Sequence, residues 1–280
     1  MTSGRRRATG GGGPGLRDLR GSLLVQASPD DAAQIAPWAD RPGGGLVLTG
    51  RDGLAAAREL LASGVRCPVL VDAARYMQVR THRRSQLSES WIDWQRSAGL
   101  PVALTDSGYV GQGDGDGLCS VLTQAAAFGP GVVAVLPLHA SWLVDDIDRL
   151  CAEVAAAEIP VALVVEHNAD PLGHLPMVDG LLRLLMLGVP VMLLRADVSA
   201  VGVLCFGGHA VAVGLRESMR RGPTRRPRQD RPGVLVPQLL RFVESQRLAG
   251  PGAAALWHCD CEVCADPDLA RSGRHGLGDE

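Results

Sequence analysis

Three thiols lie within six residues near the end of the chain: Cys259, Cys261 and Cys264. Thiolates at the spacing C-x-C-x-x-C can converge on one ion, and zinc is the metal that such clusters most often bind. A structural zinc site has four ligands, and His275 is the best candidate for the fourth, with His258 and Asp266 as alternatives. The motif therefore predicts a structural zinc site formed by the three thiols and His275.

The alternative is that these three thiols are unrelated buried or redox-active residues. A disulfide framework is a weaker interpretation, because the other cysteines are scattered singly in apolar sequence, where cysteine behaves as a small core residue. These are Cys67, Cys119, Cys151 and Cys205. Such cysteine usage is typical of a reducing compartment, so we expect a cytoplasmic protein.

The chain has 280 residues, enough for one large domain and a small appendage. Its formal net charge of -2 gives no strong electrostatic indication of nucleic-acid binding. No apolar run approaches the roughly 18 residues that a membrane span requires, so we expect no membrane association. Arg5–Arg7 precede a glycine-rich stretch rather than an apolar signal sequence, and residues 1–20 are interpreted as a disordered tail, with a nucleic-acid-binding arm as the alternative.

Short apolar runs recur along residues 22–214, mostly separated by segments with helical periodicity. They are continuous rather than alternating, which is typical of parallel strands buried on both faces. Helices are predicted over Asp52–Gly64, Leu143–Ile159 and Val178–Gly188. The eight apolar runs are Ser22–Ser28, Gly45–Gly50, Pro68–Asp72, Pro101–Asp106, Val132–His139, Pro160–His167, Pro190–Asp197 and His209–Gly214.

Eight such units in a compact segment predict a (β/α)₈ TIM barrel with a small C-terminal zinc-binding extension. An open doubly wound sheet is the alternative, although no G-x-G-x-x-G follows any of the runs. The predicted domains are the tail over 1–20, the barrel over 21–220, a basic Pro/Arg-rich connector over 221–233, and a helix plus zinc module over 234–280. The helix is expected at Val234–Arg247, which has an amphipathic pattern.

The basic segment Arg220–Arg231 carries six arginines. Arginine suits phosphate recognition because its guanidinium binds two oxygens at once, so the segment could contact an RNA backbone. It is also rich in proline and lacks aromatic residues, which is equally consistent with a flexible connector.

Nearly every predicted strand ends in a polar or ionisable residue, and the carboxyl ends of barrel strands form the catalytic face of a TIM barrel. These groups could provide a nucleophile, a general acid or base, and substrate ligands. Each also has a structural interpretation as a helix cap, a locally bonded histidine or an internal ion pair. The residues are Asp72, Asp106, His139, Glu166, His167, Arg195 and Asp197.

Asp106 is the strongest candidate. It lies in Thr105-Asp106-Ser107-Gly108-Tyr109, where a small hydroxyl residue and a glycine would permit close approach of a ligand and a tyrosine could stack on a planar ring. We therefore predict Asp106 as a catalytic residue, with Asp72, Glu166 and Asp197 as further catalytic candidates. The predicted substrate-binding residues are Ser107, Gly108, Tyr109, His139, His167 and Arg195.

The Thr-Asp-Ser-Gly motif at residues 105–108 and the C-x-C-x-x-C motif beyond the barrel together resemble the tRNA-guanine transglycosylase family. The resemblance implies a TIM barrel with a C-terminal zinc subdomain and a pentosyltransferase that exchanges a guanine base in tRNA for a 7-deazaguanine. It implies that Asp106 lies in the base pocket and acts in acid/base chemistry, and that the three thiols bind zinc. It also implies tRNA or a nucleobase as partner, and a homo- or hetero-oligomer.

The chain departs from the family pattern at several positions. Met219 stands four residues before Pro223-Thr224-Arg225, where the family has its nucleophilic aspartate, so Asp72, Glu166 or Asp197 would have to replace it. Tyr109-Val110 stands where the family has phenylalanine-glutamine, and His275 lies closer to the thiols than the family's zinc-binding histidine. Two alternatives therefore stay open: a catalytically inactive paralogue that serves as a partner or nucleic-acid-binding zinc protein, and an unrelated TIM-barrel hydrolase or lyase.

Overall fold

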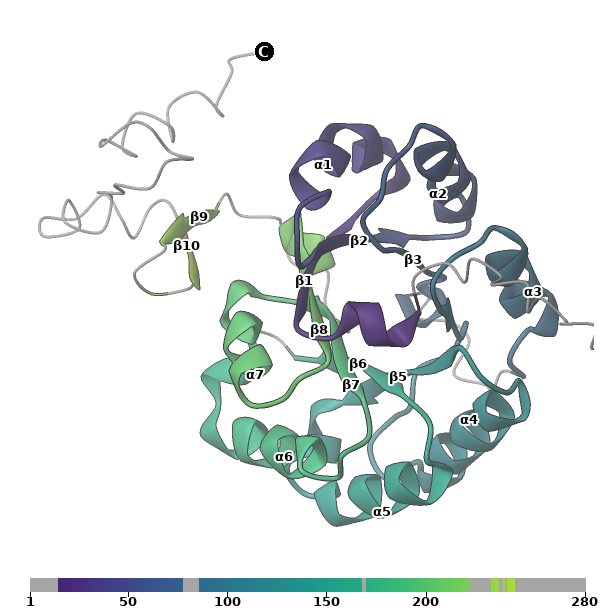
Figure 1. Ribbon diagram of the computed structural model, residues 1–280. Helices are drawn as coiled ribbons and strands as arrows, with labels where there is room; N and C mark the ends of the chain where they lie inside the picture. The colour runs from purple at the N-terminus through teal and green to yellow at the C-terminus, as the bar shows by residue number, and fades with distance from the viewer. Residues whose placement is uncertain are drawn as a thin grey trace, which may run out of the picture.

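The computed structural model describes residues 15–77, 86–167, 170–220, 222, 233–236, 239 and 241–244. Eight parallel strands form one sheet in the order β3-β2-β1-β8-β7-β6-β5-β4, and β3 lies beside β4, so the sheet is a nearly closed barrel. Helices surround this barrel on its outside (Figure 1). The predicted (β/α)₈ barrel is thus confirmed, and the open doubly wound sheet is wrong. The zinc-binding part of the extension predicted beyond the barrel lies outside the described residues and stays a prediction.

Each of the eight apolar runs corresponds to one strand, although β2 begins one residue before its run. The strands are β1 Ser22–Ala27, β2 Gly44–Thr49, β3 Val69–Asp72, β4 Ala103–Leu104, β5 Val132–His139, β6 Val161–Glu166, β7 Val191–Ala196 and β8 Ala210–Gly214. The helices are α1 Ala32–Ala39, α2 Gly53–Ala62, α3 Glu89–Ser97, α4 Gly115–Ala127, α5 Ile147–Ala157, α6 Leu175–Leu185 and α7 Val201–Cys205. No helix among the described residues is both long enough and apolar enough to cross a membrane.

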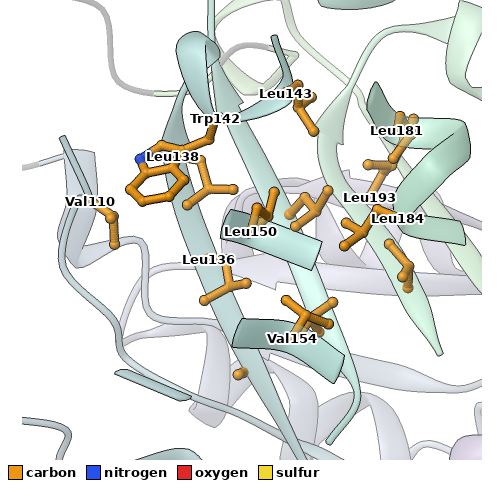
Figure 2. Close-up of a cluster of buried hydrophobic side chains, with 14 of the residues drawn as sticks. Val110, Leu136, Leu138, Trp142, Leu143, Leu150, Val154, Leu181, Leu184 and Leu193 are labelled. Carbon is orange, nitrogen blue, oxygen red and sulfur yellow. The ribbon is translucent and has the colours of Figure 1, made fainter. Parts of the chain in front are cut away.

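The strands are apolar throughout because both of their faces are buried. One set of alternating side chains fills the barrel interior, including Leu24, Val47, Leu70, Val135 and Val164. The other set packs outward against the helices, and Figure 2 shows part of that layer: Leu136 and Leu138 of β5 lie beside Leu150 and Val154 of α5, and Leu193 of β7 lies beside Leu181 and Leu184 of α6. This two-sided burial explains why the runs lack the alternation of a half-exposed sheet.

The barrel has a seam at β4, where α3 takes the place of a strand ladder to β3. The Leu104 backbone N–H donates to Gln95 Oε1 at 3.0 Å, and the Leu104 carbonyl accepts from Gln95 Nε2 at 2.8 Å and from Trp91 Nε1 at 2.9 Å. Gln95 is fully buried. Its amide therefore satisfies the backbone groups that a neighbouring strand would satisfy in a closed barrel.

Replacing Gln95 with leucine should destabilise the protein by roughly 1–3 kcal/mol, because the buried N–H of Leu104 would lose its acceptor. Urea unfolding followed by circular dichroism measures the change in free energy of unfolding. Gln34→Leu, at an exposed position on α1, is the matched control and should change that free energy by less than about 0.5 kcal/mol. Equal stability of the two variants would contradict the role given to Gln95.

Residues 15–20, which the sequence assigns to a disordered tail, belong to the barrel. A short 3-10 helix spans Leu16–Leu19, and Leu19 is fully buried against the interior side chains. The Leu16 carbonyl bonds to His209 Nε2 at 2.7 Å, and His209 directly precedes β8. This turn therefore covers the amino end of the barrel, which explains why two leucines follow the glycine-rich stretch.

The helix predicted over Val234–Arg247 does not form in the described parts of that segment. Instead, β9 (Gly233–Val236) and β10 (Arg241–Glu244) pair as antiparallel strands. Val234 and Val236 are β-branched, and Pro237 disfavours helical backbone at the residue before it, so local preference outweighs the amphipathic pattern. Val236 is almost fully buried, and β10 lies near the turn Val198–Ala200 that follows β7.

Candidate functional site

The interior face of several strands changes from apolar to polar at the carboxyl end. The interior side chains Leu24, Leu70 and Val164 are each followed, two residues later on the same face of the strand, by a polar residue. These polar residues are Gln26, Asp72 and Glu166. Thr49 follows Val47 in the same way. These polar side chains lie at the carboxyl-end opening of the barrel, hereafter the mouth, where TIM barrels carry their active sites.

A buried polar network joins the four strands β1, β2, β3 and β7 across the mouth. Gln26 donates through Nε2 to Asp72 Oδ2 at 3.0 Å and to Thr49 Oγ1 at 3.2 Å, and its Oε1 accepts from the Arg195 backbone N–H at 2.6 Å. Asp72 also accepts from the Tyr76 hydroxyl and from the Ala74 N–H. Asp72 is 1% exposed, so its carboxylate is occupied by donors of the protein itself. We conclude that Asp72 fixes the geometry of the mouth.

Two residues of this region adopt a backbone conformation that favours glycine. Arg195 has φ 52° and lies where the register of β7 against β8 shifts, and Ala74 has φ 50° directly after β3. Such conformations cost on the order of 1–3 kcal/mol and occur where surrounding contacts impose them. The Arg195 guanidinium donates to the Ser218 carbonyl in the turn after β8, and its side chain is 5% exposed. Arg195 therefore links β7 to both β1 and that turn.

The Tyr76 hydroxyl stays protonated across the physiological range. Burial raises the pKa of Tyr76 well above its usual value, the neighbouring Asp72 carboxylate raises that pKa further, and the Arg195 charge opposes the shift. A protonated hydroxyl can donate to Asp72, which the geometry requires. Tyr76 thus serves as a permanent donor within the network.

The Thr-Asp-Ser-Gly motif forms a detour from the sheet. The chain leaves the sheet after Leu104 and rejoins β5 at Val110, whose N–H donates to the Pro137 carbonyl at 2.8 Å. Within the detour, Thr105 Oγ1 accepts the Val135 N–H at 2.8 Å and lies 2.8 Å from Ser107 Oγ. The two hydroxyl residues therefore hold the loop, and Ser107, predicted to bind substrate, is buried.

Asp106 lies inside this detour, with its carboxylate directed at the connection between β3 and α3. Arg75 Nη1 lies 2.5 Å from Asp106 Oδ2, and the Ser88 N–H donates to Asp106 Oδ1 at 2.9 Å. The Asp106 side chain is 4% exposed, whereas that of Arg75 is 31% exposed. A buried carboxylate is thus covered by an arginine that still reaches water.

Tyr109 and Glu166 form a second pair at the mouth. The Tyr109 hydroxyl donates to Glu166 Oε2, across from the detour to the end of β6. The Tyr109 ring packs on the interior side chains of the barrel, and both residues are half-buried. The structure therefore brings Tyr109 and Glu166 together at the mouth, where both side chains are partly exposed. Tyr109 follows Asp106 by three residues in the chain.

The remaining predicted site residues make local contacts that stabilise the turns and loops at the strand ends. His139 ends β5 and accepts the Ser141 N–H at Nδ1 at 3.1 Å, so it caps the following turn. Asp197 accepts the Val198 N–H at 2.7 Å and also lines a largely apolar cavity between β6, β7 and α6. The His167 ring lies edge-to-face against His174, with centroids 4.6 Å apart. The half-buried Gly108 stands between Ser107 and Tyr109 in the detour.

The predicted zinc ligands Cys259, Cys261, Cys264 and His275 lie outside the described residues, as do Pro223-Thr224-Arg225. Within the described ranges, no group of three or more His, Cys, Asp or Glu side chains is placed to hold a metal ion. The other four cysteines form no disulfide, and burial raises the pKa of Cys67 to about 11. Cys119 and Cys205 are exposed, so their interpretation as core residues is wrong.

Gln26, Arg75 and Tyr76 are among the residues of the site that were not predicted from sequence. Gln26 had a signal, since it interrupts an apolar run in phase with Leu24. Arg75 and Tyr76 lie in a loop and had none. Glu217 was also missed; it begins the short turn Glu217–Met219 after β8, two residues from the position of the family's nucleophile.

Comparison with known proteins gives no match, since neither a protein-family model nor a curated protein corresponds to this sequence. The geometry of the mouth is therefore the basis for any assignment of function.

Proposed function

We propose that the protein is a transglycosylase of the tRNA-guanine transglycosylase type, which exchanges a guanine or 7-deazaguanine base, with tRNA as the substrate. The observation that carries the proposal is the Asp106 detour: a buried carboxylate at the mouth of a (β/α)₈ barrel, three residues from a tyrosine that contacts a second carboxylate. The C-x-C-x-x-C motif beyond the barrel adds independent support.

A carboxylate suits this base for a chemical reason. The edge of guanine that carries N1–H and the 2-amino group presents two adjacent donors, and an ionised aspartate offers acceptors only. Asp106 would accept these donors, and the Tyr109 ring would stack on the base plane. The barrel holds Asp106 through the Ser88 N–H, so the carboxylate would be oriented before the base arrives.

Among the predicted replacement nucleophiles, Glu166 has the most suitable surroundings. Asp72 is occupied by several donors and is 1% exposed, and Asp197 caps the turn after β7. Glu166 is half-buried at the mouth and contacts the Tyr109 hydroxyl. A hydroxyl donor holds a carboxylate in one orientation, as a nucleophile requires.

In the proposed reaction, a Glu166 carboxylate oxygen attacks C1′ of the nucleotide and the C1′–N9 bond breaks. The electron pair of that bond goes to the departing guanine, which takes up a proton from water. The incoming base gives the proton of its ring nitrogen to water, and that nitrogen attacks C1′ and displaces Glu166. No oxidant or metal is required, and the carboxylate is regenerated.

Zinc would have a structural role only. Three thiolates and an imidazole are the donor set of a closed tetrahedral zinc site, which contributes folding free energy rather than chemistry. In this proposal the ligands are Cys259, Cys261, Cys264 and His275, and the arginines of the connector over 221–233 contact RNA phosphates. A reduced thiol cluster and a tRNA substrate are both consistent with the cytoplasm.

The first test is the zinc content of the purified full chain, followed by incorporation of labelled guanine into tRNA on the same sample. We expect about one zinc per chain, lost in Cys261→Ser and kept in the control Cys119→Ser, whose thiol is exposed on α4. We also expect incorporation by the wild type. If the protein holds zinc but incorporates no guanine into tRNA, a binding paralogue is favoured. If it holds no zinc, the C-terminal motif no longer supports the proposed function.

A further inference from the structure

We infer that Arg75 occupies the position on Asp106 that the base takes, so that base binding exchanges the arginine for the base. This inference rests on the proposed function and adds to it a competing group within the protein.

The first argument is the number of acceptor positions at Asp106. Oδ1 accepts the Ser88 N–H at 2.9 Å, and Oδ2 lies 2.5 Å from Arg75 Nη1. The carboxylate is 4% exposed, so little of its surface is open to another donor. A base that binds Asp106 through two N–H groups therefore needs the place that the guanidinium holds.

The second argument is chemical similarity. The N1–C2–N2 part of guanine is itself a guanidine unit, planar and with adjacent N–H groups directed at one side. The Arg75 guanidinium has the same planar arrangement of donors. A carboxylate arranged to bind one is therefore arranged to bind the other, and the two compete for a single position.

The third argument is that Arg75 can leave without disturbing the barrel. Its side chain is 31% exposed, so the guanidinium can be rehydrated when it moves away. Its neighbour Tyr76 is 3% exposed and donates to Asp72, and Ala74 on the other side donates its N–H to the same carboxylate. Because these contacts fix the backbone on both sides, the exchange involves the side chain alone.

The exchange has a measurable cost. A protein whose binding position is covered for about nine-tenths of the time binds its ligand about tenfold more weakly. Removing the competing group should remove that factor. Arg75→Met removes the guanidinium and keeps an unbranched side chain, and we expect it to bind guanine and 7-deazaguanine about tenfold more tightly than the wild type does.

The experiment is isothermal titration of the full chain with guanine, 7-deazaguanine and hypoxanthine. Hypoxanthine lacks the 2-amino group and should bind more weakly to every variant. Arg183→Met is the matched control, because Arg183 of α6 pairs with Asp148 of α5 on the outside of the barrel, and it should bind as the wild type does. Arg75→Lys keeps a charge without the planar fork and should lie between wild type and Arg75→Met.

Unchanged or weaker binding by Arg75→Met, with a folded variant, would overturn the inference, as Arg75 would then be structural or a ligand of the base. If Arg75→Met does not fold, Arg75→Lys decides by the same comparison. Asp106→Asn separates the two proposals. If wild-type binding requires Asp106 but is insensitive to Arg75, the proposed function stands and the inference fails. If neither the wild type nor Arg75→Met binds either base, both fail.

Discussion

Asp106→Asn should reduce guanine exchange by roughly 10²–10⁴-fold, the range typical for loss of a positioned acid/base group. Asparagine has the same shape, and its carbonyl oxygen can still accept the Ser88 N–H, so the detour should keep its conformation. Its amide nitrogen would face the second position, where it can only donate. A guanine edge made of donors would then lack an acceptor. The rate of labelled guanine incorporation into tRNA measures the effect.

Asp40→Asn is the matched control for this substitution. Asp40 also accepts backbone N–H groups, from Arg66 at 3.2 Å and Cys67 at 2.8 Å, and its carboxylate pairs with an arginine at 3.9 Å. It lies before β2 and beside the residues that lead into β3, at the opposite end of the barrel from the mouth. Exchange by Asp40→Asn should match that of the wild type, and equal activity of both variants would exclude Asp106 from the base pocket.

The barrel could be predicted from sequence because its strands are buried on both faces. Val132–Leu138 and Val161–Val164, for example, are apolar at every position, which few other arrangements allow. Prolines before β6 and β7, Pro160 and Pro190, marked the ends of the preceding helices. The short β4 was harder to predict, because Thr105 resembles a strand residue and its N–H bonds the Val133 carbonyl at 3.1 Å, but its hydroxyl accepts the next N–H of β5, that of Val135.

The polar network could be predicted only in part. Strand-end residues such as Asp72 and Glu166 are visible as polar groups that end apolar runs. Their partners are not, because contacts such as Gln26 to Arg195 join positions 169 residues apart, and they depend on which strands are neighbours in the closed sheet. The arginine that covers Asp106 could not be predicted for the same reason. Arg75 reaches it across the seam between β3 and β4, which no sequence pattern reveals.

The sequence pattern also predicts the wrong structure at both ends of the described chain. Residues 15–20 follow a glycine-rich stretch and look like a tail, yet Leu19 fills the amino end of the barrel because the interior there would otherwise be open. At Val234–Val236, helical periodicity suggested a helix, although the β-branched residues and the following proline favour the strand that forms. The first segment is ordered by long-range packing and the second by short-range preference, so the two expectations failed for opposite reasons.

Glu166→Gln should abolish exchange, with a loss of at least about 10⁴-fold, because an amide oxygen cannot form the covalent intermediate at C1′. The amide has the shape of the carboxylate and can still accept the Tyr109 hydroxyl, so folding and base binding should persist. A covalent protein–RNA adduct that survives denaturing electrophoresis should form with the wild type and be absent from the variant. Glu153→Gln, half-buried on α5 outside the barrel, should keep both adduct and activity.

Two further variants make this test specific for the nucleophile. Tyr109→Phe removes the hydroxyl that orients Glu166 but leaves the carboxylate, so exchange should fall only about 10–100-fold and the adduct should still form. Glu217→Gln and Asp197→Asn change the other carboxylates near the ends of β7 and β8. If Glu166→Gln still forms the adduct, and Asp197→Asn or Glu217→Gln does not, the nucleophile is the carboxylate in the turn after β7 or β8, respectively. Glu166 would then have a binding role at the mouth.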